Sequence, residues 1–119
     1  MSLKDVLNRF TLVSGFERDR VSHYLPIILD CIRIFQEKIQ NNNFSEVDML
    51  RLTHACAVFA YYKVSLCLGS ESFTSFKAGD VEFDVENIKQ TALSVWESEK
   101  AQIADLLGND DFSFMRVEV

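Results

Sequence analysis

The residues of this sequence that could ligate a metal ion or attack a substrate are two histidines and three cysteines: His23, His54, Cys31, Cys56 and Cys67. A transition-metal site needs ligands that converge, and the sequence has neither a C-x-x-C nor an H-E-x-x-H spacing. His54 and Cys56 are two positions apart in a helical stretch, so their side chains point to different sides of the helix. We therefore expect no metal ion and no other cofactor.

A catalytic thiol would need exposed, electropositive surroundings. Each cysteine instead lies among apolar residues of a predicted helix, where a free thiol behaves as a small hydrophobic side chain. Asp110 and Asp111 are adjacent acids in a polar loop, and Gly79 belongs to no phosphate-binding pattern. We therefore predict that the protein is not an enzyme and has no small-molecule substrate. The odd number of cysteines favours a reducing cytoplasm over a disulfide framework.

A cluster of aromatic residues in the last part of the chain is the more informative set. Five phenylalanines lie between residues 73 and 114, with two lone cations near them. A small sheet has too few faces to bury them all unaided, and an exposed apolar patch marks an interaction site. Packing of these rings against helices is the alternative. We predict a protein interface that consists of Phe73, Phe76, Lys77, Phe83, Phe112, Phe114 and Arg116.

The stretch over about 46–68 predicts the central helix of a bundle. Every position of Ala55–Tyr62 is apolar or aromatic, and a helix that is apolar all round is buried on most sides. Ser45 and Asp48 have the spacing of a capping box, and Gly69 suits the residue after a helix. Charged and ionisable residues interrupt the apolar run, so it does not predict a membrane span.

Pro26 divides the preceding helical stretch, because proline cannot donate a backbone hydrogen bond and favours the first turn of a helix. We predict a short helical turn over Arg18–His23 and a longer helix from about Leu25 to Gln40. One continuous helix with a kink at Pro26 is the alternative. The asparagines of 41–43 form the loop before the central helix.

Two further helices are predicted at the start and in the second half of the chain. Ser2 can cap a helix from Leu3 to about Phe10, and Gly15 would end the helix if it continues past Phe10. Asp84 can cap a helix that stops at Gly108.

Two segments have the pattern of β-structure. Residues of about 73–83 flank a Gly-Asp turn and predict a short hairpin, which would be marginally stable alone. Residues 115–119 alternate between apolar and charged, which predicts a C-terminal strand that pairs within its own subunit or with another chain. The predicted fold is therefore mainly α: a small helical bundle around a central buried helix, with a β-hairpin and a C-terminal strand.

The length of 119 residues fits one domain, 1–119, and the first residues lack the apolar core of a signal peptide. The net charge of −6 is unevenly distributed: residues 1–70 sum to +1 and residues 71–119 to −7. An acidic half disfavours ordinary contact with nucleic-acid phosphates, which requires clustered lysine and arginine. A surface that avoids nucleic acid, or that meets a basic partner, would have this charge.

The order of these segments resembles that of the small head–tail connector, or neck adaptor, proteins of tailed phages and bacterial prophages. The residues that carry the resemblance are an Ala- and Tyr-rich helix, AVFAYYKVSLCL, followed by Ser75-Phe76-Lys77-Ala78-Gly79-Asp80-Val81 and the short end Asp111-Phe112-Ser113-Phe114. The resemblance extends from about Phe16 to the end of the chain. Its motifs contain no catalytic residue.

The resemblance implies a structural protein that assembles as a ring under the portal of a DNA-filled head and extends the DNA channel. Its partners would be copies of itself, the portal and tail-completion proteins, and DNA would pass without sequence-specific binding. It would be located in the cytoplasm of the bacterial host during assembly and then in the virion neck. The alternative function is a small adaptor that binds one partner and forms no ring.

Overall fold

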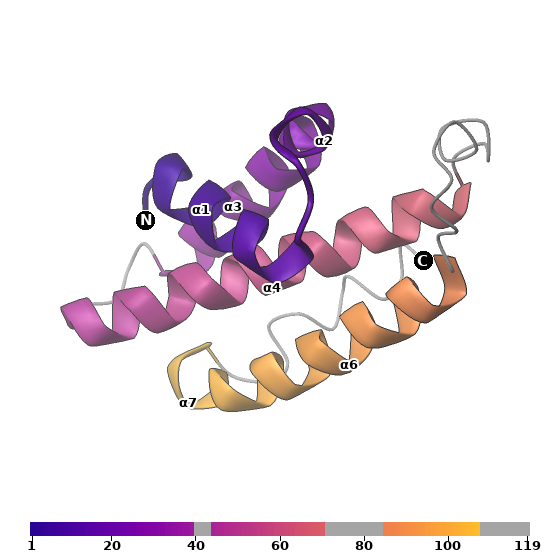
Figure 1. The fold of residues 1–119 in the computed structure, drawn as a ribbon. Helices are drawn as coiled ribbons and strands as arrows, with labels where there is room; N and C mark the ends of the chain where they lie inside the picture. The colour runs from indigo at the N-terminus through magenta and orange to yellow at the C-terminus, as the bar shows by residue number, and fades with distance from the viewer. Residues whose placement is uncertain (40–43, 71–84, 108–119) are drawn as a thin grey trace.

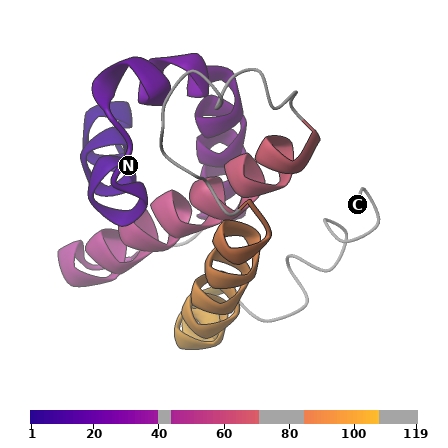
Figure 2. The ribbon, with the colours of Figure 1, turned by 45° about the vertical axis from the view of Figure 1, so that its right-hand side comes forward.

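The computed structural model describes residues 1–39, 44–70 and 85–107, and these residues form a helical bundle in three layers (Figure 1). The longest helix, α4 (Glu46–Ser70), runs through the middle. On one side of it lie α1 (Leu3–Ser14), α2 (Arg18–His23) and α3 (Leu25–Ile39), and on the other lie α6 (Val85–Gln102) and α7 (Ala104–Leu107). Figure 2, turned by 45°, shows the same separation of the two sides by α4.

The ends of α1 follow from its flanking residues. The Oγ atom of Ser2 accepts a hydrogen bond from the Asp5 N–H at 3.2 Å, which satisfies one of the free amides of the first turn. Gly15 has a φ of +73°, and its N–H donates to the Thr11 carbonyl at 2.9 Å. Glycine adopts this left-handed conformation without steric cost. The predicted stop at Gly15 is confirmed, and α1 extends beyond the predicted Phe10 to Ser14.

The predicted division at Pro26 is also confirmed. Helix α2 covers Arg18–His23 as predicted, and Tyr24 leaves the helical conformation with φ −100° and ψ 13°. Helix α3 then begins at Leu25, which places Pro26 in its first turn, where the missing N–H costs no helical hydrogen bond. The single kinked helix is therefore not formed.

The middle of α4 is the core of the molecule. All seven residues from Ala55 to Tyr61 are buried, which confirms the predicted central helix. Alanines at 55, 57 and 60 let neighbouring helices approach closely, and Phe59 contacts rings on both sides. The ring centroid of Phe59 lies 5.9 Å from that of Phe35 in α3 and 4.8 Å from that of Trp96 in α6.

The predicted apolar faces extend further along the helices than burial does. Val47 and Leu50 share a face of α4 with the buried Val58, yet their side chains are 65% and 59% exposed. Leu29 is apolar and lies next to the buried Ile28 of α3, yet it is 44% exposed, and Val95 of α6 is 38% exposed. Helical periodicity identifies a face but does not specify how far a neighbouring helix covers it.

Arg51 of α4 joins the central helix to the end of α6 and to α7. Its Nη2 atom donates to the Gln102 carbonyl at 2.6 Å and to Asp105 Oδ1 at 3.0 Å. A guanidinium group at the last carbonyl of a helix complements the negative end of the helix dipole. The pairing of Arg51 with Asp105 raises the pKa of Arg51 and lowers that of Asp105, mainly through their side-chain hydrogen bond.

The predicted helical bundle is consistent with the structure, but the predicted β-structure is wrong for what the structure describes, because residues 1–39, 44–70 and 85–107 contain helices and no strand. The hairpin predicted over about 73–83 and the strand predicted over 115–119 both lie outside the described residues. The hairpin was predicted from two β-capable runs around a Gly-Asp turn and the strand from a short alternating run, and runs this short do not distinguish reliably between strand and other structure. None of the described helices is long and apolar enough to cross a membrane.

Candidate functional site

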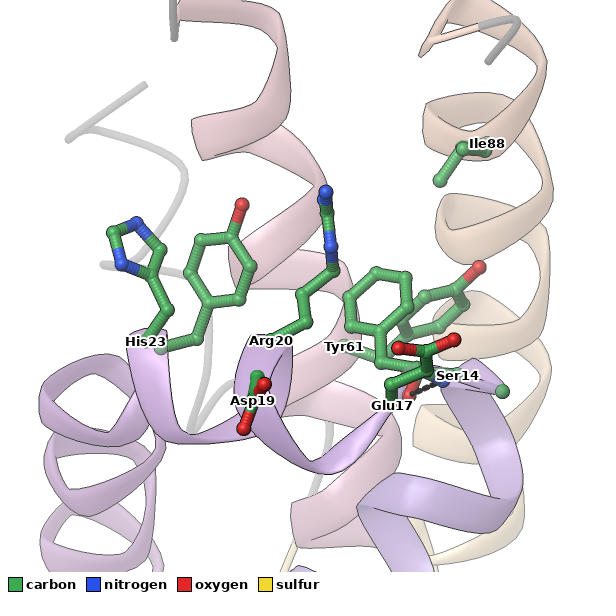
Figure 3. A pocket seen from close by; sticks show the side chains of 10 residues that line it. Ser14, Glu17, Asp19, Arg20, His23, Tyr61 and Ile88 are labelled. Atoms are coloured by element: carbon green, nitrogen blue, oxygen red, sulfur yellow. Dashed lines mark hydrogen bonds between the residues drawn. The ribbon is translucent and has the colours of Figure 1, made fainter. Parts of the chain in front are cut away.

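A hollow of about 720 Å³ opens where α1 and α2 meet the middle of α4 and the start of α6. Figure 3 shows how the side chains around it come from separate helices: Arg20 and His23 from α2, Tyr61 from α4 and Ile88 from α6. Four parts of the sequence therefore contribute to one concave surface.

The tight connection between α1 and α2 forms one wall of the hollow. Gly15 turns the chain, and the Oγ atom of Ser14 then accepts a hydrogen bond from the Phe16 N–H at 3.1 Å (Figure 3). This local bond holds the turn and directs the half-buried Phe16 ring toward α4. The ring of Phe16 lies edge-on to Tyr61, with 6.1 Å between the centroids.

Aromatic rings make up the floor of the hollow. Phe16 also lies 6.0 Å from Phe10 and 6.2 Å from Tyr24, measured between ring centroids. The centroid of Tyr61 is 6.5 Å from that of Phe10, so one cluster connects α1, the α1–α2 turn, the junction of α2 with α3, and α4. Burial raises the pKa of Tyr61 above the ordinary value of 10.

The rim of the hollow carries charges of both signs. Arg20 lies 5.7 Å from the centroid of the Phe16 ring, within the range of a cation–π contact. Glu17 and Asp19 bring two carboxylates, and His23 stacks edge-on against Tyr24 at 4.8 Å. A mixed rim above an aromatic floor suits the docking of an apolar side chain from another protein.

The candidate nucleophiles lie elsewhere, in apolar surroundings. Burial raises the pKa of the Cys31 thiol to about 12 and raises that of Cys56 as well. Such thiols carry almost no thiolate at neutral pH, and the thiolate is the reactive form. Among the described residues there is no group of three or more histidine, cysteine, aspartate or glutamate side chains that could hold a metal ion.

His54 faces α6 rather than the hollow. Its Nε2 atom is 4.0 Å from Oε1 of Glu99, and its buried Nδ1 atom has no hydrogen-bond partner within the described part of the chain. His23 lies on α2. The two histidines are therefore held on different helices with different neighbours, as their positions in the sequence predicted.

The predicted interface residues, from Phe73 to Arg116, all lie outside the described residues, so the structure does not place them. Sequence reasoning missed the hollow, although Gly15 followed by Phe16 is a signal for a turn with an adjacent aromatic ring. Tyr61 was predicted as part of an apolar face of the central helix. Only the tertiary fold brings its ring beside Phe16 and Tyr24.

Comparison with known proteins adds no relative from which a role could be transferred. No protein-family model matches the chain, and neither the curated proteins nor the solved structures include a significant match.

Proposed function

We propose that this protein is a structural subunit that assembles with copies of itself, and that it joins head to tail in a phage or prophage as a connector ring. The observation that carries the proposal is exposed apolar surface on a bundle with a closed core. Leu12, Val47 and Leu50 are 77%, 65% and 59% exposed, while the middle of α4 is fully covered. These three side chains add nothing to the core, and exposed apolar surface is typical of assembly.

The resemblance to connector proteins supports the particular kind of assembly. In this role the ring would contact the portal and tail-completion proteins, and the interface residues predicted between Phe73 and Arg116 would serve those partners. The acidic second half of the sequence, with a net charge of −7 over 71–119, would let DNA slide through without binding. The protein would be located in the cytoplasm of the bacterial host during assembly and in the virion neck afterwards.

The second candidate function is a small adaptor that binds a single partner. The hollow beside Tyr61 favours it, because a concave aromatic site of about 720 Å³ can receive one apolar side chain without any self-assembly. Neither function requires chemistry by the protein.

Native mass spectrometry across a wide range of protein concentration, with electron microscopy of the same sample, tests the proposal. Closed rings of many identical subunits are the expected result. A monomer at every concentration, also in the presence of a purified portal ring, would contradict the connector and leave the single-partner adaptor.

A further inference from the structure

The first turns of α4 present an exposed apolar surface with an acidic edge. We call Glu46, Val47 and Leu50 the α4 tip. Val47 and Leu50 are 65% and 59% exposed, and Glu46 lies one helical turn before Leu50, so the three side chains are neighbours on one face. Glu46 is exposed and has no ion-pair partner within the described residues. The α4 tip therefore ends in a carboxylate that is available to a cation.

A second apolar surface lies between α1 and α2. We call it the α1–α2 groove, a hollow of about 760 Å³ lined by Leu7, Leu12, Val21, Arg18 and small polar side chains. Leu12 is 77% exposed, whereas Val21 is buried and forms the floor. The groove thus offers apolar contact area that no part of the described subunit covers.

The charge of the α1–α2 groove is opposite to that of the α4 tip. Among the described residues that line it, Arg18 carries the charge and none is a carboxylate. Further along the same face of α1, Lys4 and Asp5 both lie one turn before Asn8, so their charges offset each other and Arg18 sets the sign of the groove. Arg18 is exposed and, like Glu46, has no ion-pair partner within the part of the chain described by the structure. The hydroxyl of Thr11 already donates to the Leu7 carbonyl at 2.9 Å, so covering it leaves no donor unsatisfied.

We propose that the α4 tip of one subunit docks into the α1–α2 groove of the next subunit. Val47 and Leu50 cover Leu12 and Val21, and Glu46 pairs with Arg18. A second copy of this chain is the occupant because each surface has the apolar character and the opposite charge that the other requires. The inference rests on the proposed function, since it specifies the contact through which the subunits assemble.

The two surfaces lie at different places on the subunit. In both Figure 1 and Figure 2 the start of α4 projects at one end of the bundle, away from α2. Contacts between two different surfaces repeat head to tail, and they close into a ring when the rotation between subunits allows it. A contact of this kind leaves one free tip and one free groove on every open chain of subunits.

Two variants, each with one surface impaired, test the contact. The tip variant carries Val47→Gln and Leu50→Gln, and the groove variant carries Leu12→Gln and Arg18→Gln. All four positions are exposed and glutamine is a good helix former, so circular dichroism should show an intact bundle. Loss of one buried leucine should weaken association roughly 10- to 100-fold.

The decisive measurement is the mass of the mixture. Each variant alone should stay monomeric at a concentration where the unmodified protein assembles. The groove variant keeps an intact tip and the tip variant keeps an intact groove, so equal amounts of the two should form a one-to-one dimer and nothing larger. A Leu29→Gln control, on an exposed position of α3 outside both surfaces, should assemble like the unmodified protein.

Exchange of the two charges tests the pairing of Glu46 with Arg18. Glu46→Lys and Arg18→Glu should each weaken association, and the chain that carries both substitutions should regain it. The regained association should depend less on salt than an association that came only from a change in the overall charge. If the tip variant and the groove variant each assemble at the concentration where the unmodified protein does, this contact is overturned and the proposed function is left intact. No dimer in the mixture would also overturn it, because the intact tip of one variant would then have failed to bind the intact groove of the other. Failure of the unmodified protein to assemble, with or without the portal, would overturn both.

Discussion

The middle and the beginning of α4 have similar apolar residues in very different surroundings. From Ala55 to Tyr61 every residue is buried between α1 and α3 on one side and α6 on the other. In the first turns, Val47 and Leu50 remain mostly exposed. The same helix therefore serves two purposes: its middle holds the subunit together, and its first turns are free to contact another molecule. The middle is apolar at every position and is covered on both sides, whereas the first turns also carry Glu46, Asp48 and Arg51 and leave their apolar residues exposed.

The largest expected effect contrasts a ring from the middle with a leucine from the first turns. Phe59→Ala removes a side chain that contacts Phe35 and Trp96, and it should lower the free energy of unfolding by about 3–5 kcal/mol because a cavity remains. Leu50→Ala should change it by less than about 0.5 kcal/mol. Urea unfolding followed by circular dichroism measures both, and equal losses in the two variants would refute the contrast.

Alkaline titration should sharpen the same contrast through two buried thiols of the core, Cys56 in the middle of α4 and Cys31 in α3. Because burial raises the folded-state pKa of Cys31 from 9.0 to about 12, its contribution is complete below pH 9 and is lost as the pH rises toward 12. Cys56 acts in the same direction. The free energy of unfolding should fall by up to about 1.4 kcal/mol per pH unit for each thiol in this range.

The matched comparison for the thiols is a variant with Cys31→Ala and Cys56→Ala. Its stability should depend less steeply on pH between 9 and 11 than that of the unmodified protein, because every other ionisable group is the same in both. Parallel pH profiles would show that the two thiols are not protected by burial.

The smallest expected effect concerns the ion pair at the beginning of α4. Arg51→Ala should release α7 locally, with faster amide exchange over 104–107 and little change over 55–61. Acid should have the same effect on the unmodified protein. The pKa of Asp105 is lowered in the fold, so its contribution is present above the ordinary value of 3.8 and is lost as the pH falls through the folded-state value.

Arg33→Ala is the control for this exchange experiment. Arg33 pairs with Glu37 within α3 at 3.2 Å, with both side chains largely exposed, and it has no part in holding α7. Unchanged exchange over 104–107 in the Arg51 variant would mean that packing of Leu107 alone holds the short helix.

The parts of this fold that the sequence predicted are those set by local stereochemistry. Pro26 marks a helix boundary because its ring and missing N–H exclude it from a helix interior, and Gly15 ends α1 because it accepts a positive φ. The continuous apolar run in α4 identified the buried middle. These inferences need no knowledge of which distant parts of the sequence pack against each helix.

The parts that were missed depend on neighbours distant in the sequence. The hollow needs Phe16, Tyr24 and Tyr61 to meet, and no spacing along the chain indicates that. Val47 and Leu50 share a helical face with the buried Val58, so the periodicity of α4 does not predict that they remain exposed. The predicted hairpin relied on two short β-capable runs around a turn and the predicted C-terminal strand on a short alternating run, and none of these runs is long enough to be decisive.

The central position of α4 has a consequence for synthesis on the ribosome. Helices α1–α3 precede α4 and can cover one side of it as soon as it emerges. The other side, which includes the face of Phe59 toward Trp96, stays uncovered until the chain has been extended through α6. Partly made chains expose apolar surface of this kind to chaperones and to one another. A truncation that ends at residue 70 should therefore aggregate, although it contains four of the six described helices.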